Sequence, residues 1–327
     1  MKTFIAEVEH NGKEVFDKWG GLFPTTKSYK QVIFCNEDFQ VVSPVRNIYG
    51  EYEPFLICIK DRYKGKDYKE IKKTLLSIDE TTTLRANCSG PVNKRMLEKE
   101  NGWKEGVDYK LRTPNSYWTK NPKTNDWNEI AHGHEINSLL LGYKRGRFTG
   151  DIGLSGWAKE NKDRWKILQK ISALNEEAYK IAYPKKHREQ KTFAEKYIKK
   201  TNRIGIYTAL SPNKFNEKSL TKAMSFHIDK GDTKFGFTSM CVFREGEYKG
   251  AYLIFPKWGV AIDTQDGDVI LADSSELHGV SPIKGKGTRL SCVAYCDNGL
   301  ATLGIMGKKE KLIGIKRKKE RSLEDFF

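Results

Sequence analysis

The stretch Ser225-Phe-His-Ile-Asp229 places a histidine and an aspartate two residues apart. On a β-strand, residues i and i+2 point to the same face, so His227 and Asp229 can meet on one metal ion. A second histidine, His278, follows further along the chain. Two histidines and one carboxylate are the facial triad of non-haem Fe(II) oxygenases, and they leave coordination positions open for other ligands. The sequence therefore predicts that these three residues bind iron.

A second motif follows this triad at a short distance. Arg289 lies 11 residues after His278, and Ser291 shares a strand face with it. A guanidinium group can hold a carboxylate through two parallel hydrogen bonds, and a nearby hydroxyl adds one more donor. This pair fits the distal carboxylate of 2-oxoglutarate. The other end of the cosubstrate would bind at the iron, together with dioxygen. Taken singly, His227 could be an ordinary core histidine and Arg289 could face solvent, so the prediction depends on all four residues together.

The sequence around these motifs indicates a sheet-rich region preceded by helices. Strands are expected at residues 204–210, 238–243, 251–255, 269–272 and 290–296, separated by glycine-containing turns. Upstream, residues 157–202 repeat apolar side chains at helical spacing. Pro184 is expected to end the first helix, and a second helix is expected from about 191 to 200. This order predicts an α+β fold, a sandwich or barrel braced by helices.

The first half of the chain offers fewer chemical signals. Residues 1–79 mix strand-like segments (31–35 and 54–59) with a basic helix at 69–78, and a scaffold or DNA-contact role is expected. Residues 80–160 are rich in turns. His132 and His134 have ligand-like spacing there, but no third ligand accompanies them, so we interpret them as loop histidines.

Composition limits the classes of function. The chain has 58 Lys+Arg against 42 Asp+Glu, a formal net charge of +16, which favours a polyanionic partner such as nucleic acid over a merely lysine-rich surface. The six cysteines form no CxxC pair, so a disulfide framework or zinc ribbon is not indicated. No apolar run suggests a signal peptide or a membrane span, so we expect a soluble, intracellular protein of open compartment.

Several segments together resemble the TET/JBP oxygenases, which act on pyrimidine bases of DNA. The resemblance covers roughly residues 80–297 and is specific over 225–295. It rests on His227-x-Asp229, residues 250–256, 259–263, 267–273 and 278–283, and Arg289-x-Ser291, with looser matches at 83–91 and 137–143.

This resemblance implies a double-stranded β-helix (jelly-roll) core with Fe(II) inside, cosubstrate 2-oxoglutarate, and conversion of 5-methylcytosine or thymine to the hydroxymethyl base. Further oxidation to formyl and carboxyl bases is also consistent with it. Asp232 matches the position that contacts the base, and an acceptor there suits the exocyclic amine of cytosine. Asp297 stands where methylcytosine members can place a histidine, which leaves the base open. We expect 5-methylcytosine, with thymine, or a substrate among RNA, proteins or small metabolites, as alternatives.

The C-terminal segment carries a separate signal. Eight basic residues lie between Lys308 and Arg321, typical of a phosphate-binding tail. Leu323, Phe326 and Phe327 then resemble a peptide that binds a sliding clamp. We therefore expect three parts: a mixed extension at 1–79, an oxygenase domain at 80–300 (helical 157–202, catalytic sheets 203–297), and a tail at 301–327. The sequence does not indicate the oligomeric state or the sequence context of the substrate.

Overall fold

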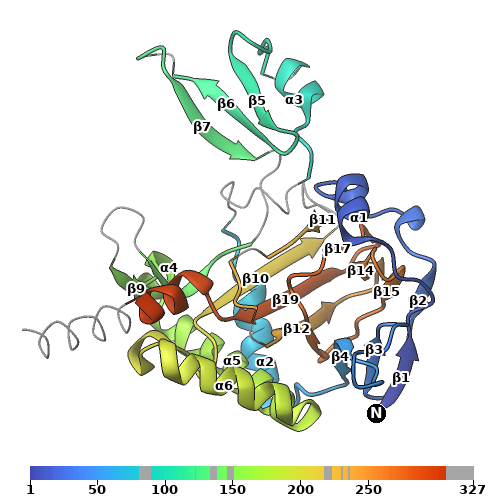
Figure 1. The fold of residues 1–327 in the computed structure, drawn as a ribbon. Helices are drawn as coiled ribbons and strands as arrows, with labels where there is room; N and C mark the ends of the chain where they lie inside the picture. The colour runs from blue at the N-terminus through green and yellow to red at the C-terminus, as the bar shows by residue number, and fades with distance from the viewer. Residues whose placement is uncertain are drawn as a thin grey trace, which may run out of the picture.

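The computed structural model describes the chain apart from residues 81–89, 100, 122, 133–137, 146–150, 217–222, 230, 235 and 307–327. Two facing sheets form its centre (Figure 1). In spatial order, the larger sheet contains β1 (Lys2–Ile5), β3 (Phe39–Val42), β4 (Pro54–Ile59), β16 (Val269–Ala272), β12 (Thr238–Glu245), β19 (Thr288–Tyr295), β10 (Ala209–Asn216), β8 (Leu141–Arg145) and β9 (Ile152–Leu154). The smaller sheet contains β11 (Met224–His227), β17 (His278–Val280), β14 (Leu253–Phe255), β15 (Val260–Ile262) and β2 (Gln31–Ile33).

The connections between these sheets define the fold. Strands β10, β12, β16 and β19 are neighbours in the larger sheet, and β11, β14, β15 and β17 are neighbours in the smaller one. The chain crosses between the two sheets repeatedly from β10 to β19, which is the double-stranded β-helix. The expected α+β class with a jelly-roll core is thus confirmed.

Apolar side chains fill the space between the sheets. This core takes residues from both sheets, including Phe215, Val242 and Ile270 from the larger and Phe255 and Val260 from the smaller. Strand side chains alternate between faces, so each strand also contributes to the opposite face of its sheet. The inner core holds the two sheets at a fixed separation, and the site lies between them.

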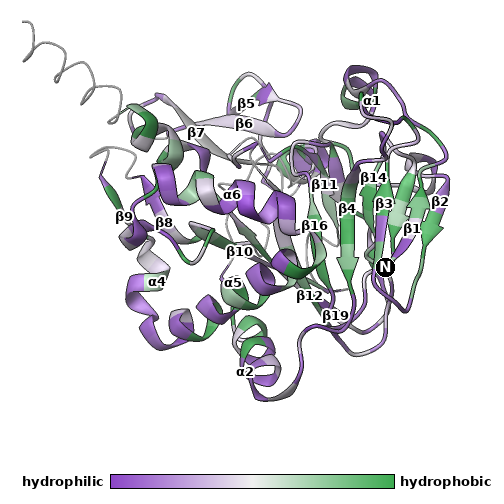
Figure 2. Ribbon diagram, turned by 60° about the horizontal axis from the view of Figure 1, so that its bottom comes forward, coloured by the Kyte–Doolittle hydropathy of each residue, from purple (hydrophilic) through white to green (hydrophobic). Residues whose placement is uncertain are grey.

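A second core lies on the outer face of the larger sheet. There, α2 (Gly65–Leu76) and α5 (Lys162–Ala182) bury apolar side chains at three- and four-residue spacing, such as Ile71, Leu168 and Ile171. Polar residues cover their exposed faces (Figure 2). The other helices are α1 (Gly12–Trp19), α3 (Lys94–Lys99), α4 (Gly156–Glu160), α6 (Pro184–Tyr197) and a helix at residues 298–306, with 3₁₀ turns at Thr26–Ser28 and Lys200–Asn202. In the described part of the chain, no helix has the length and apolarity that crossing a bilayer requires.

The N-terminal segment and the turn-rich segment take different positions. Strands β1, β3 and β4 extend the larger sheet, and β2 extends the smaller one. Residues 90–132 instead form a separate three-stranded sheet of β5 (Tyr109–Thr113), β6 (Ser116–Lys120) and β7 (Trp127–His132), which stands away from the two facing sheets (Figure 1). We call this unit, residues 90–132, the arm. A short pair, β13 (Lys249–Gly250) and β18 (Ile283–Lys284), completes the strands.

Two expected element boundaries were wrong. The strand expected at 204–210 begins only at Ala209 and continues through Pro212 to Asn216. The carbonyl of Pro212 accepts from the amide of Leu139, so the missing proline N–H faces that side and leaves the β19 ladder intact. The helix expected from about 191 begins at Pro184, because proline needs no amide partner in the first helical turn.

Candidate metal centre

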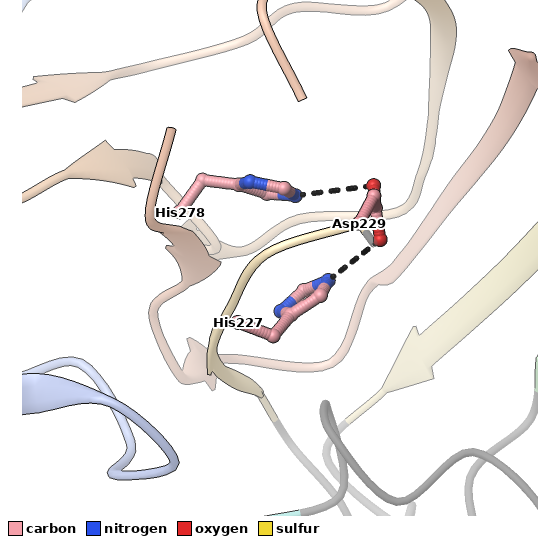
Figure 3. A group of neighbouring side chains, drawn as sticks. All are labelled: His227, Asp229 and His278. Carbon is pink, nitrogen blue, oxygen red and sulfur yellow. Dashed lines mark ion pairs between the residues drawn. The ribbon is translucent and has the colours of Figure 1, made fainter. Parts of the chain in front are cut away.

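Three potential metal ligands converge between the two sheets. One ligand atom each from His227, Asp229 and His278 lies within 4.8 Å of the others. The Nε2 atoms of His227 and His278 are each 3.6 Å from a different oxygen of the Asp229 carboxylate, as Figure 3 shows. His227 is the last residue of β11 and pairs directly with His278, the first residue of β17. Pairing of these strands therefore sets the spacing of the two imidazoles.

Backbone carbonyls fix the orientation of both imidazoles. The Nδ1 of His227 lies 2.7 Å from the carbonyl oxygen of Ser225, and the Nδ1 of His278 lies 2.9 Å from that of Glu276. A carbonyl can only accept a hydrogen bond, so each Nδ1 carries the proton and each Nε2 keeps its lone pair. The Nε2 atoms face Asp229. This is the arrangement that metal-binding histidines adopt, with the second nitrogen held by a backbone acceptor.

The position of Asp229 corrects the strand argument made from the sequence. β11 ends at His227, so Asp229 lies beyond the strand and not on its face. Its amide instead donates to the carbonyl of Ser274, 3.1 Å away, in the loop before His278. This hydrogen bond brings the carboxylate to both imidazoles. Asp229 is also the most exposed of the three, at 33% for its side chain, so the triad is open on the carboxylate side.

Arg289 is buried in the same interior. Its side chain is 1% exposed, and its Nη1 donates to the hydroxyl of Ser291 at 2.8 Å. Its Nε has no hydrogen-bond partner among the described residues, and no carboxylate there pairs with it. Burial lowers the pKa of Arg289, and the nearby Arg244 lowers it further, while Tyr248 and Cys241 raise it. A buried guanidinium with an unpaired donor is costly unless an anion binds it.

A pocket of about 50 Å³ lies between two residues of the triad and the strand face that carries Arg289. Its lining includes Asp229, His278, Met240 and Val293. Val293 lies four residues after Arg289 on β19, on the same strand face, and Nη2 of Arg289 is 3.9 Å from the sulfur of Met240. The residues therefore fit a small dicarboxylate that reaches from a metal ion to a buried cation. Two imidazoles and a carboxylate are a donor set that suits Fe(II).

Asp232 lies beside this cavity. Its Oδ2 accepts a hydrogen bond of 2.6 Å from the hydroxyl of Thr238, which lines the cavity. Burial raises the pKa of Asp232 to about 8, and the neighbouring Asp229 carboxylate raises it as well. Thr238 and Ser274 were missed from the sequence, because a hydroxyl in a loop or at a strand start carries no signal without its partner.

Asp297, which stands where methylcytosine members can place a histidine, caps a helix in this structure. It forms a backbone bridge with Asp232, and its Oδ1 accepts from the amide of Leu300 at 2.9 Å. It is thus the N-cap of the helix at residues 298–306. Burial raises the pKa of Asp297, whereas hydrogen bonds from the amides of Leu300 and Gly299 lower it.

Of the remaining predicted residues, the structure describes only the backbone of His132. Leu323, Phe326 and Phe327 lie outside the residues that the structure describes, as does His134. The backbone of His132 ends β7 in the arm.

A comparison with known families matches the segment that contains the candidate metal centre. Residues 159–298 match the Tet_JBP family, described as the oxygenase domain of the 2OGFeDO superfamily. All four residues of the centre lie within this span. Members of this superfamily use Fe(II), 2-oxoglutarate and dioxygen. The donor set of the triad suits Fe(II), and the buried arginine suits a carboxylate of 2-oxoglutarate.

Similar individual proteins cover less of the molecule. A bifunctional helicase and thymine dioxygenase, JBP2, from Trypanosoma brucei brucei is 40% identical over 77 residues, which is 23% of this chain and 7% of that protein. JBP2 of Trypanosoma cruzi is 35% identical over 77 residues, so this chain spans under a tenth of the curated relatives' length. Among solved structures, NgTET1 in complex with 5mC DNA matches 90% of this chain and 93% of its own at 12% identity, with a TM-score of 0.48. A viral collagen prolyl hydroxylase from Paramecium Bursaria Chlorella virus-1 matches 73% and 94% at 13% identity, with a TM-score of 0.32.

Proposed function

We propose that this chain, whose residues 159–298 are an oxygenase domain of the TET/JBP kind, oxidises the 5-methyl group of a pyrimidine base in DNA. The observation that carries the proposal is a triad of metal-binding side chains beside a pocket whose lining residue Met240 contacts a buried arginine with an unpaired Nε. The net charge of +16 suits a polyanionic substrate.

Each residue of the centre has a distinct task in this proposal. His227, Asp229 and His278 hold Fe(II), and the backbone acceptors of Ser225 and Glu276 keep both imidazoles in the binding orientation. Arg289, assisted by Ser291, holds the distal carboxylate of 2-oxoglutarate through its guanidinium. Bound iron and cosubstrate supply the oxidation of a carbon–hydrogen bond by dioxygen, with succinate and carbon dioxide as co-products.

The substrate base has to leave the helical stack to reach the cavity, at a cost of a few kcal/mol. We propose that Asp232, held in place by Thr238, contacts the base there. A carboxyl oxygen of Asp232 can accept from the exocyclic amine of cytosine, so 5-methylcytosine is the substrate we favour. Thymine is the second candidate, because the curated relatives that match this chain are named as thymine dioxygenases.

Nucleoside mass spectrometry tests this proposal directly. Purified protein is incubated with Fe(II), 2-oxoglutarate and duplex DNA that contains either 5-methylcytosine or only unmodified bases. Hydroxymethylcytosine supports the favoured substrate, and hydroxymethyluracil supports thymine. His227→Ala is the control, which should lose all product because a metal ligand is missing. Succinate formed without a modified base in either DNA would contradict the proposal and point to a different substrate class.

We further propose that Leu323, Phe326 and Phe327 bind a sliding clamp. Support comes from the sequence alone, in which an aliphatic and two aromatic residues follow a basic segment. Deletion of residues 322–327 should abolish binding to a cognate clamp in a pull-down, whereas oxidation of a short DNA duplex should be unchanged. Clamp binding that survives the deletion would end this proposal.

A further inference from the structure

The arm carries an unusual combination of side chains on one face of its sheet. Strand pairing places Lys110 opposite Trp118 and Lys120 opposite Trp127. The cation of Lys110 lies 4.7 Å from the ring centre of Trp127, and that of Arg112 lies 5.4 Å from the ring centre of Trp118. These contacts show that two tryptophans and at least two cations share this face. We call it the tryptophan face.

The opposite face of the arm accounts for its folding. Tyr109 is fully buried there, packs edge-on against Tyr117 at 6.2 Å, and donates from its hydroxyl to Glu98 of α3. Leu97 of α3 is buried as well. We call the side with Tyr109 and Tyr117 the tyrosine face. Its packing accounts for the folding of the arm, but it does not account for two tryptophans on the opposite face.

The tryptophan face is not covered by the rest of the protein. In the part of the chain that the structure describes, β5, β6 and β7 make extensive contacts only with their neighbours in this sheet. Figure 1 shows the sheet standing clear of the two facing sheets. Lys110 and Arg112 are exposed, and Trp118 and Trp127 are half-buried. The face thus offers aromatic surface and positive charge to a partner.

The root of the arm is fixed next to the metal centre. The amide of Gly90 donates to the hydroxyl of Ser225, two residues before His227, and the amide of Asn115 side chain reaches the carbonyl of Gly21. Gly21 in turn donates to the carbonyl of Phe226 on β11. A side chain at Gly90 would overlap the ring of Phe23, so the root lies close against this region. The root of the arm is therefore anchored against β11, the strand that carries the first metal ligand.

We propose that the tryptophan face binds the DNA strand that flanks the base entering the cavity. Aromatic rings stack on bases or deoxyribose without sequence preference, and interleaved lysine and arginine neutralise phosphates. An anionic polymer with flat apolar rings complements both features of the face, whereas an acidic peptide would use only its charge. The inference rests on the proposed function for its choice of DNA, and the position of the root explains why the contact would lie beside the reacting base.

Binding measurements with two sets of variants test this inference. The first set is Trp118→Ala with Trp127→Ala, with Trp118→Phe and Trp127→Phe as the matched pair that keeps an aromatic ring. We expect the alanine pair to weaken binding of a fluorescent 5-methylcytosine duplex about tenfold or more, and the phenylalanine pair to restore most of it. An arm that merely unfolded would not be rescued in this way, and thermal unfolding of each variant checks its fold.

The second set changes charge. Lys110→Gln, Arg112→Gln and Lys120→Gln together should reduce the slope of log Kd against log salt by about 2 to 3, since each lost phosphate contact removes about 0.9. The matched control is Lys166→Gln, Lys180→Gln and Lys185→Gln on the exposed sides of α5 and α6, which removes the same charge elsewhere and should leave the slope unchanged.

The outcomes separate this inference from the proposed function. Wild-type affinity and slope in both arm sets would overturn the inference and leave the oxidation of DNA bases intact. Weakened binding in both sets, with no modified base formed by the wild type, would support the arm and contradict the proposed function.

Discussion

Arg289 combines features that oppose folding and favour ligand binding. It is a buried cation with a lowered pKa, and its Nε has no partner in the described part of the chain. Replacing it by methionine removes a buried charge, so Arg289→Met should raise the free energy of unfolding of the ligand-free protein by about 1–4 kcal/mol. The same variant should lose the stabilisation by 2-oxoglutarate, which for the wild type is about 2.7 kcal/mol at 100 times Kd.

Thermal unfolding with Mn(II), with and without 2-oxoglutarate, measures both effects. Ser291→Ala is a milder comparison, because it removes one hydroxyl that contacts the guanidinium and leaves the charge. A ligand-dependent shift that persists in Arg289→Met would show that another group holds the distal carboxylate.

The sequence predicted the types and the order of these residues, but not how they meet. Residue type, spacing and strand alternation selected His227, Asp229, His278 and Arg289. The structure brings the first three together and buries Arg289 on the strand face that also lines the adjoining pocket. Asp229 reaches the imidazoles through a hydrogen bond to Ser274, a contact across more than forty residues that alternation cannot supply. Thr238 beside Asp232 depends in the same way on how the chain folds back.

At the scale of elements, Asp297 links the end of β19 to the helix at 298–306. Burial raises its pKa above the ordinary aspartate value of 3.8, so the folded state favours the protonated form. The stability it contributes is therefore complete below pH 3.8 and is lost as pH rises through the higher folded pKa. Asp297→Asn keeps an oxygen that can accept from the amide of Leu300, and the asparagine side chain cannot ionise. The free energy of unfolding of this variant, relative to that of the wild type, should therefore increase when the pH is raised from about 4 to about 8.

Urea unfolding at both pH values checks this expectation. Asp297→Ala, which also removes the cap, should cost about 1 kcal/mol relative to Asp297→Asn at either pH. A difference between wild type and Asp297→Asn that does not change with pH would show that the carboxyl is not buried as described.

A buried polar contact joins α5 to the larger sheet. Asn175 is 0% exposed, accepts from the hydroxyl of Tyr63 at 2.6 Å and donates to the hydroxyl of Ser239 at 3.1 Å. Asn175→Leu should destabilise the protein by about 1–3 kcal/mol for each partner left unsatisfied. Denaturant unfolding of Tyr63→Phe, Asn175→Leu and the double variant measures the coupling. Costs that simply add would mean that the contact does not contribute to stability.

Helices and sheet content could be predicted from the sequence more closely than the boundaries and the arm. Apolar spacing identified α5, and β4 was predicted at its observed bounds. The expected strand stopped before Pro212 and the expected second helix began after Pro184, whereas the structure includes each proline in its element, for a reason that depends on its neighbours. The arm was interpreted as loops, because its strands are short, and only their pairing reveals a tyrosine face and a tryptophan face.

At the scale of the whole molecule, the proposed chemistry and the proposed DNA binding belong to different parts. The triad lies between the sheets, whereas the excess of 16 positive charges belongs to the chain as a whole and the tryptophan face projects from it. Contacts with phosphates supply most of the affinity for DNA and make it depend on salt. Loss of a metal ligand should therefore leave DNA binding almost unchanged.

His227→Ala tests this separation. Its turnover should fall by more than the roughly 10- to 100-fold loss that changes around metal ligands cause, because a ligand itself is missing. Its Kd for duplex DNA and the slope of log Kd against log salt should match the wild type, with a positive slope of at least about 3 if the three arm cations contact phosphates. Fluorescence anisotropy from about 50 to about 200 mM salt measures both quantities. If His227→Ala instead loses affinity at every salt concentration, recognition of the base at the metal centre, and not the basic surface, holds the DNA.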